Sequence, residues 1–177
     1  MMTEFLTVGH SNRELGEFLD MLRGAGADMV VDVRRLPGSR KYPWFDRENL
    51  APALREAGIG YRHAPSLTGR RPRQKDIPAE VNGFWENRSF HNYADYALSG
   101  EFQEGLTELR GGDAARPTLL CAEAVWWRCH RRIIADHLLA RGETVLHLMG
   151  PGKLTPAKLN EGAEVGADGS LTYPGDA

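Results

Sequence analysis

Residues 117–137, PTLLCAEAVWWRCHRRIIADH, give the clearest indication of how this chain folds. It begins with a short apolar run that ends at Cys121 and is typical of a buried strand. A polar turn carrying Glu123 follows, and residues 126–141 have the periodicity of a helix that Gly142 can end. A thiol, a carboxylate, an imidazole and several guanidinium groups are concentrated in and after this turn. In an open parallel sheet, ligands bind outside the carboxyl ends of the strands and against helix N-termini. We therefore expect a functional site here.

On either side of this stretch, apolar runs alternate with segments of helical periodicity. We expect strands at residues 5–8, 29–33, 59–63, 118–121 and 144–149, and helices at residues 15–22, 45–57, 90–109 and 126–141. Two glycines interrupt the third of these helical segments, which is therefore one helix or two. The alternation predicts βαβ units with right-handed crossovers. The predicted fold class is α/β: a mostly parallel open sheet of about five strands with helices on both faces, the layering of Rossmann-like and flavodoxin-like proteins.

The chain has 177 residues, which fits one domain, and we expect this domain to cover residues 1–150. Residues 151–177 are rich in glycine and proline, so we expect a loosely packed tail with a short strand at residues 171–173. No apolar run is long enough to span a membrane, and no membrane partner is predicted. The first residues lack the pattern of a signal peptide, and two cysteines make no disulfide framework. These features favour a cytoplasmic location.

The net charge of −2 conceals an asymmetry. Residues 34–75 contain eleven basic and three acidic side chains, a net charge of +8, which leaves −10 for the rest of the chain. A basic segment in an acidic chain indicates an anionic partner such as a small phosphorylated ligand or a nucleic acid. A solvated basic face is the alternative.

Polar residues also follow the other expected strands. His10 and Ser11 follow the first strand, Asp32 and Arg34 lie at the end of the second, and His63 ends the third. Because the carboxyl ends of parallel strands meet at one edge of a sheet, we expect these residues to gather beside the turn described above. We assign ligand binding to Ser11, Asp32, Arg34 and His63.

Four residues are candidates for catalysis. Glu123 could act as general acid or base, with His10 or His130 as a second proton carrier. Cys129 is expected in the first turn of its helix, where the helix dipole and neighbouring cations would lower the pKa of the thiol. Burial as a small core residue is the alternative for Cys129, a helix cap is the alternative for Glu123, and a ring packed on the sheet is the alternative for His130.

Anion binding is assigned to two further residues of the same stretch, Arg128 and Arg131, whose guanidinium groups can donate paired hydrogen bonds to phosphate. The alternative for both is solvated surface or an ion pair. A metal site would have ligand types available in Cys121, Cys129, His130, His10 and His63, but no pair has the spacing of a metal motif. The sequence therefore predicts no metal site, and it contains no GxGxxG or Walker A pattern that would indicate a cofactor.

Five motifs resemble those of DUF488, a family of domains of unknown function that is widespread in bacteria. They are TVGHS (7–11), DVRRLPGSR (32–40), YRHAPSLTG (61–69), FHNYADYA (90–97) and CAEAVWWRCHRRIIADHL (121–138). The resemblance implies a compact α/β domain with these polar segments at one site, and it implies no particular reaction. The chain departs from the family pattern at Thr68, where we expect a second glycine.

A weaker likeness is to rhodanese and cysteine-phosphatase sites, in which a cysteine after a strand is followed by a phosphate-binding loop and an arginine. Cys121 and Arg128 imitate that layout. The residues between them include no glycine, however, and Glu123 would repel an anion there.

These features lead to one hypothesis and two alternatives. The hypothesis is an enzyme that acts on a phosphorylated or nucleotide-like ligand, nucleic acid included. The alternatives are a thiol-dependent transferase of the rhodanese or phosphatase type, and a non-catalytic module that binds nucleotides or nucleic acid through residues 34–75. The sequence indicates no oligomeric state.

Overall fold

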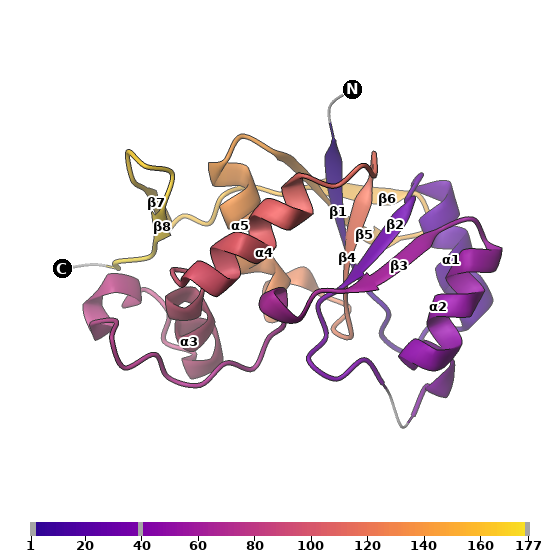
Figure 1. The fold of residues 1–177 in the computed structure, drawn as a ribbon, viewed down its shortest axis with the longest axis horizontal. Coiled ribbons are helices and arrows are strands. Elements are labelled where there is room, and N and C mark those ends of the chain that lie inside the picture. The colour runs from indigo at the N-terminus through magenta and orange to yellow at the C-terminus, as the bar shows by residue number, and fades with distance from the viewer. Residues whose placement is uncertain (1–2, 39–40, 176–177) are drawn as a thin grey trace.

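The computed structural model describes residues 3–38 and 41–175, which form a six-stranded sheet with helices on both faces (Figure 1). The strands of this sheet are β1 (Glu4–Gly9), β2 (Met29–Asp32), β3 (Gly60–His63), β4 (Pro117–Cys121), β5 (Thr144–Gly150) and β6 (Lys153–Pro156), and a separate hairpin contains β7 (Glu164–Val165) and β8 (Leu171–Thr172). The α-helices are α1 (Leu15–Gly24), α2 (Arg47–Glu56), α3 (Arg88–Tyr96), α4 (Gly100–Arg110) and α5 (Arg131–Ala140). Four short 3-10 helices connect them: η1 (Pro43–Phe45), η2 (Pro65–Leu67), η3 (Ala79–Asn82) and η4 (Trp126–Arg128). Among the described residues, no helix is long and apolar enough to cross a membrane.

The strand order is β3-β2-β4-β1-β5-β6. The first five of these strands run parallel to their neighbours, and β6 is antiparallel to β5. This arrangement confirms the predicted α/β class with a mostly parallel sheet. β4 lies between β1 and β2, so the polar turn after β4 stands at the centre of the sheet's carboxyl edge.

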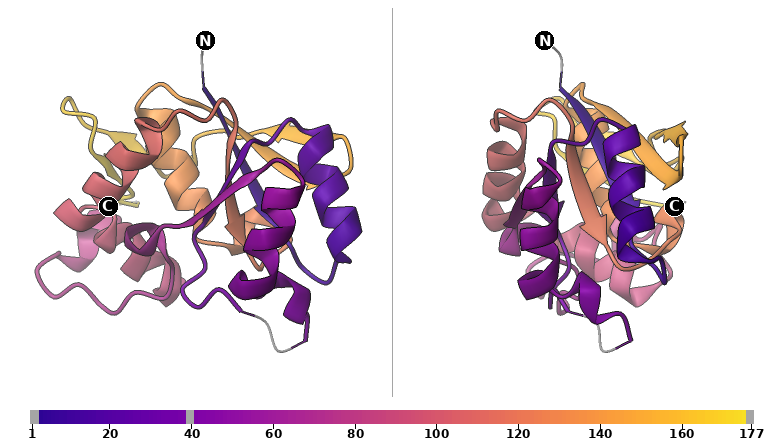
Figure 2. Two further views of the ribbon diagram at one scale, coloured as in Figure 1. Left: turned by 45° about the vertical axis from the view of Figure 1, so that its right-hand side comes forward. Right: turned by 90° about the vertical axis from the view of Figure 1, so that its right-hand side faces the viewer.

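Both faces of the sheet are covered, as the alternation of apolar side chains along the strands requires. On β1, Phe5 belongs to the core that α3, α4 and α5 close, whereas Leu6 and Val8 belong to the core that α1 and α2 close. The same division holds on β2, where consecutive residues Val30 and Val31 enter opposite cores. Figure 2 shows the sheet between these two helical layers.

Two segments with helical periodicity in the sequence each form two separate helices in the structure. The segment predicted at residues 126–141 divides into η4 and α5, because Cys129 has an extended backbone with φ −126° and ψ 146°. Cys129 therefore precedes α5, and its predicted position in the first turn of the helix is wrong. The segment at residues 90–109 forms two helices, and the Ser99 side chain caps the second by accepting a hydrogen bond from the Phe102 N–H.

The segment after β5 packs more closely than the expected loose tail. β6 adds a strand to the sheet edge, and the expected short strand near residue 171 is present as β8. Leu171 and Tyr173 are fully buried against α5. The Tyr173 hydroxyl donates a hydrogen bond to Asp136 Oδ2 at 2.7 Å, and its backbone N–H donates to Asn82 Oδ1 at 2.8 Å. The C-terminal segment is thus fastened to the domain.

Candidate functional site

The carboxyl ends of the central strands converge because β1, β4 and β2 are adjacent. Gly9 pairs with Cys121, and Asp32 pairs with both His63 and Leu120. The backbone N–H groups of His10 and Ser11 continue the pairing by donating to the carbonyls of Cys121 and Ala122. A Cβ atom at Gly9 would lie 1.7 Å from the Glu123 carbonyl oxygen, so only glycine permits this approach.

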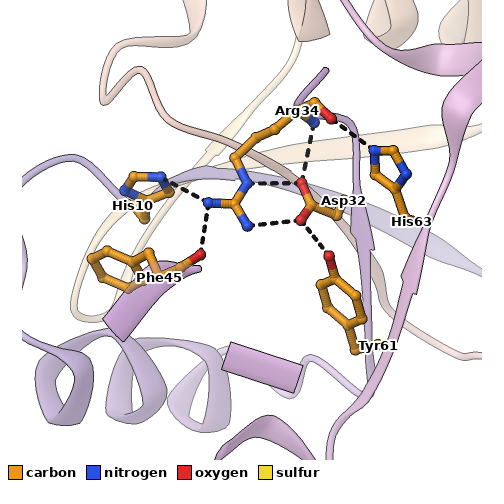
Figure 3. A network of polar contacts seen from close by, with 6 residues as sticks. All are labelled: His10, Asp32, Arg34, Phe45, Tyr61 and His63. Atoms are coloured by element: carbon orange, nitrogen blue, oxygen red, sulfur yellow. Dashed lines mark hydrogen bonds and ion pairs between the residues drawn. The ribbon is translucent and has the colours of Figure 1, made fainter. Parts of the chain in front are cut away.

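Asp32 and Arg34 form the centre of a buried polar network (Figure 3). Arg34 donates from Nε to Asp32 Oδ1 at 2.9 Å and from Nη2 to Oδ2 at 2.8 Å. The same guanidinium donates from Nη1 to the Phe45 carbonyl at 2.8 Å, and the Tyr61 hydroxyl donates to Asp32 Oδ2 at 2.5 Å. His63 Nε2 lies 2.7 Å from the Arg34 carbonyl oxygen, to which it can donate. Most donors of Arg34 are therefore directed at the protein.

His10 joins this network as a neutral ring. Its Nδ1 lies 2.9 Å from the Ser11 carbonyl, and its Nε2 lies 3.3 Å from Arg34 Nη1. Burial and, to a smaller extent, the positive charge of Arg34 lower the pKa of His10 to about 4, against the hydrogen bond to Ser11 and the charge of Asp32. The neutral ring donates from Nδ1 and accepts at Nε2. Ser11 itself has a left-handed backbone with φ 52°, which turns the chain away from the strand end.

A second cluster lies across the β4–α5 turn. The Sγ atoms of Cys121 and Cys129 and a ring nitrogen of His130 all lie within 4.8 Å of one another. Cys129 Sγ lies 3.7 Å from His130 Nδ1 and accepts a hydrogen bond from the Arg131 N–H at 3.4 Å. Gly69 packs against the ring from the other side, since a Cβ atom there would lie 2.7 Å from His130 Nδ1.

The two thiols have opposite tendencies to ionise. The hydrogen bond with Cys129 and burial both raise the pKa of Cys121. Burial opposes ionisation of Cys129 as well, but the hydrogen bond from Cys121 and the charge and N–H of Arg131 outweigh it and lower the pKa of Cys129. Cys129 is therefore the more easily ionised of the two thiols.

Arg131 is placed in the interior, with 0% of its surface exposed. Its guanidinium donates to Thr7 Oγ1 at 3.2 Å, to the Glu123 carbonyl at 2.6 Å and to the Ala124 carbonyl at 3.2 Å. Among the described residues no carboxylate forms an ion pair with it. Arg131 therefore stabilises the β4–α5 turn and supplies a buried positive charge beside Cys129.

Two adjoining cavities open at this edge of the sheet, and we call them together the cleft. They measure about 770 and 530 Å³, and Arg70, Cys121, Ala122 and His130 line both. The larger cavity also contains Glu123, Arg128, Cys129, Phe90 and Tyr93, and the smaller one contains Arg34. The turn after β4 thus forms the wall between the two cavities.

Charged side chains at the cleft are available to a ligand. Glu123 and Arg128 are exposed, and the carboxylate of Glu123 makes one long contact, 3.4 Å, with the Val125 N–H. Within residues 3–38 and 41–175, no hydrogen bond or ion pair is found for the Arg70 or Arg128 side chain. Besides Arg34 and Arg35, the cleft therefore presents the uncommitted guanidinium groups of Arg70 and Arg128 and the carboxylate of Glu123.

Phe90, Tyr93 and Arg70 are among the cleft residues that the sequence-based list of site residues does not include. Tyr93 and Phe90 show helical spacing, which is normally a sign of core packing, and Tyr93 is indeed fully buried while its ring also contacts His130 at 4.9 Å. Arg70 has a left-handed backbone with φ 58°, held by a hydrogen bond from Arg35 Nη1 to its carbonyl at 2.8 Å. Nothing in the sequence signals this conformation, because arginine rarely adopts it.

The fold and the site define a class: a layered α/β protein with a Cys–His–Arg cluster at the carboxyl edge of its central strands. The family model described as domain of unknown function DUF488 matches residues 14–138. The chain belongs to this family, which confirms the resemblance seen in its motifs. The matched residues include β2, β3, β4 and the whole turn between β4 and α5, whereas His10 and Ser11 precede them. No curated protein and no solved structure matches the chain.

Proposed function

We propose that this protein is an enzyme that binds a phosphorylated or nucleotide-like ligand in the cleft, with Glu123 as the proton donor and acceptor. One observation carries the proposal: the larger cavity combines the guanidinium groups of Arg70 and Arg128, the carboxylate of Glu123 and the half-buried aromatic ring of Phe90. Phosphate is bound by guanidinium groups, and a base can stack on aromatic rings.

The two arginines are suited to anion binding because their side chains are not committed elsewhere. Arg70 keeps its unfavourable left-handed backbone at the mouth of both cavities. Backbone strain of this kind is concentrated at functional sites, where surrounding contacts maintain it. In Arg34 and Arg131, in contrast, each guanidinium nitrogen donates a hydrogen bond to the protein, and we assign these two residues the role of holding the cleft walls.

The binding step is tested with a panel of inorganic phosphate, sugar phosphates, nucleotides and short oligonucleotides, by thermal shift and calorimetry. A hydrogen bond to a charged group contributes about 1.5–3 kcal/mol, so Arg128→Ala and Arg70→Ala should each weaken binding by about tenfold or more. Arg55→Ala is the matched control, because Arg55 is exposed near the far end of α2. Equal affinity of all three variants for the phosphorylated ligand would contradict the proposed anion site.

The catalytic step is tested with Glu123→Gln, which preserves shape and removes the proton carrier. We expect unchanged ligand affinity and loss of turnover, by about 10²-fold or more. Glu56→Gln, at the last residue of α2, is the control. Binding without turnover of any member of the panel in the wild-type protein would favour the non-catalytic binding module.

The thiol-dependent alternative has a specific observation in its favour. Cys129 Sγ accepts the Arg131 N–H and lies beside a buried positive charge, which is a setting for a nucleophilic thiolate. Turnover that survives Glu123→Gln but is lost in Cys129→Ser and after iodoacetamide treatment would establish this alternative.

A further inference from the structure

The cluster of Cys121, Cys129 and His130 has the dimensions of a metal site. Its three ligand atoms lie within 4.8 Å of one another, and the Cys129 Sγ to His130 Nδ1 distance is 3.7 Å. In a tetrahedral zinc centre, with bonds of about 2.3 Å to sulfur and 2.0–2.1 Å to nitrogen, two ligand atoms lie about 3.5–3.8 Å apart. Small side-chain adjustments would therefore bring all three atoms to bonding distance.

The donor types select the kind of ion. Two sulfurs and one imidazole favour a thiophilic transition-metal ion such as Zn²⁺, and they disfavour Mg²⁺ and Ca²⁺, which prefer oxygen ligands. Three protein ligands leave one position of a tetrahedral site open, as in catalytic zinc centres.

The surroundings of Cys129 suit a metal-bound thiolate. The Arg131 N–H already donates to its Sγ, as an outer-shell partner would. Two thiolates neutralise the charge of a divalent ion, and the guanidinium of Arg131 would then balance a hydroxide at the open position. No carboxylate competes for Arg131 in the described part of the chain.

The open position would face the cleft. Cys121 and His130 line both cavities, and Cys129 lines the larger one, which also contains Glu123. Glu123 follows Cys121 by two residues, so its exposed carboxylate shares a cavity with any water bound to the ion.

We propose that Cys121, Cys129 and His130 form a site for one thiophilic divalent cation, Zn²⁺ in the first instance, whose open coordination position faces the cleft beside Glu123. Binding of the ion stands independently of the function proposed above. Its role, to hold and activate the water from which Glu123 removes a proton, rests on that function.

The test uses the full chain after chelation, titrated with Zn²⁺ alone and followed by calorimetry and native mass spectrometry. We expect one ion per chain. Cys121→Ser and His130→Gln should each weaken binding by about 100-fold or more, since loss of even an outer-shell partner costs 10–100-fold. His91→Gln, a histidine on α3 that contacts Asp95, is the matched control. Co²⁺ should give sulfur-to-metal charge-transfer absorption that Cys121→Ser reduces.

Because Cys129 is buried, the substitution Cys129→Ser risks unfolding the protein. The test therefore relies on Cys121→Ser and His130→Gln, and circular dichroism checks that each variant is folded. Absence of stoichiometric zinc, or affinity equal in the wild-type and these two variants, would overturn the metal site. Turnover by the chelated protein would overturn its catalytic role while the proposed function stands. If the protein binds zinc but turns over no anionic ligand, the proposed metal site is supported and the proposed enzymatic function is refuted.

Discussion

Asp32 and Arg34 face each other through two parallel hydrogen bonds, Nε to Oδ1 at 2.9 Å and Nη2 to Oδ2 at 2.8 Å, with 0% and 5% of their surfaces exposed. They are separated by one residue, and because residues i and i+2 of an extended chain point to the same side, their side chains lie next to each other at the end of β2. The pair fixes the wall of the smaller cavity and organises His10 and His63 around it.

Removing one partner of this pair should be strongly destabilising, because it leaves a buried charge without compensation. For Asp32→Asn we expect a loss of about 3–5 kcal/mol in the free energy of unfolding, measured by urea denaturation. Tyr61→Phe removes only the hydroxyl that donates to Asp32 and should cost about 1.5–3 kcal/mol. A loss below about 1 kcal/mol for Asp32→Asn would show that the pair is not maintained in solution.

Asp136 should make stability fall as the pH rises from about 4 to 6. Burial, against the hydrogen bonds from Tyr173 and Asn160 and the charge of Arg132, raises the pKa of Asp136 from 3.8 to about 6. Between these two pH values the folded state binds more protons than the unfolded state. The free energy of unfolding therefore decreases as the pH rises, by about 3 kcal/mol in all. Asp136→Asn should flatten this part of the stability profile; parallel profiles for the two proteins would contradict the prediction.

His137 acts in the opposite direction. Burial, with the nearby Arg141 charge, lowers its pKa from 6.5 to about 3, and its buried Nε2 has no hydrogen-bond partner in the described structure. Below pH 6.5 the unfolded state gains a proton that the folded state does not, so stability falls as the pH falls. At pH 5 this loss amounts to about 2 kcal/mol, and His137→Leu should recover it. Chemical denaturation at pH 5 and 7 measures the difference, and an equal effect at both values would argue against titration.

Gly69 should be required for the geometry of His130. An added methyl group at Gly69 would lie 2.7 Å from His130 Nδ1 and must displace the ring. Gly69→Ala should therefore reduce zinc affinity by at least about tenfold. Gly16→Ala is the control, because a Cβ atom there meets nothing within 4 Å. Full zinc binding by Gly69→Ala would mean that the ring does not depend on this contact.

Arg70 should lower the stability of the fold and contribute to the binding of phosphorylated ligands. A left-handed residue other than glycine costs about 1–2 kcal/mol, and asparagine tolerates that conformation better than arginine. Arg70→Asn should therefore raise the free energy of unfolding by up to about 1 kcal/mol while weakening the binding of phosphorylated ligands. A variant that is less stable but binds normally would show that Arg70 serves the fold alone.

The fold was largely predictable because its signals are local. The apolar run around Val30 and Val31 predicts a strand covered on both faces, and the strand–helix alternation predicts the parallel sheet. The strand order was not predictable, since nothing in β4 specifies β1 and β2 as its neighbours. The burial of Tyr173 was also hidden, because its partners Asn82 and Asp136 are far away in the sequence.

The candidate site was predictable only as a location. Parallel strands bring Asp32 and His63 to the edge that also carries Cys121, and this follows from topology. Whether a guanidinium faces the cleft or the core depends on packing, and Arg131 enters the core although Arg128, three residues earlier, stays exposed. The eight-residue separation of Cys121 and Cys129 likewise matches no motif, yet the extended backbone at Cys129 brings the two sulfurs together.

The position of β4 between β1 and β2 has a consequence for a chain that is still being made. β1 pairs only with β4 and β5, so its apolar residues Phe5, Leu6 and Val8 have no strand partner until residue 118 has been added opposite Leu6. At about 5–20 residues per second, the ribosome needs roughly 6–22 s to supply that partner. During this interval β1 is an unpaired hydrophobic strand, a kind of segment that is prone to aggregation in a nascent protein.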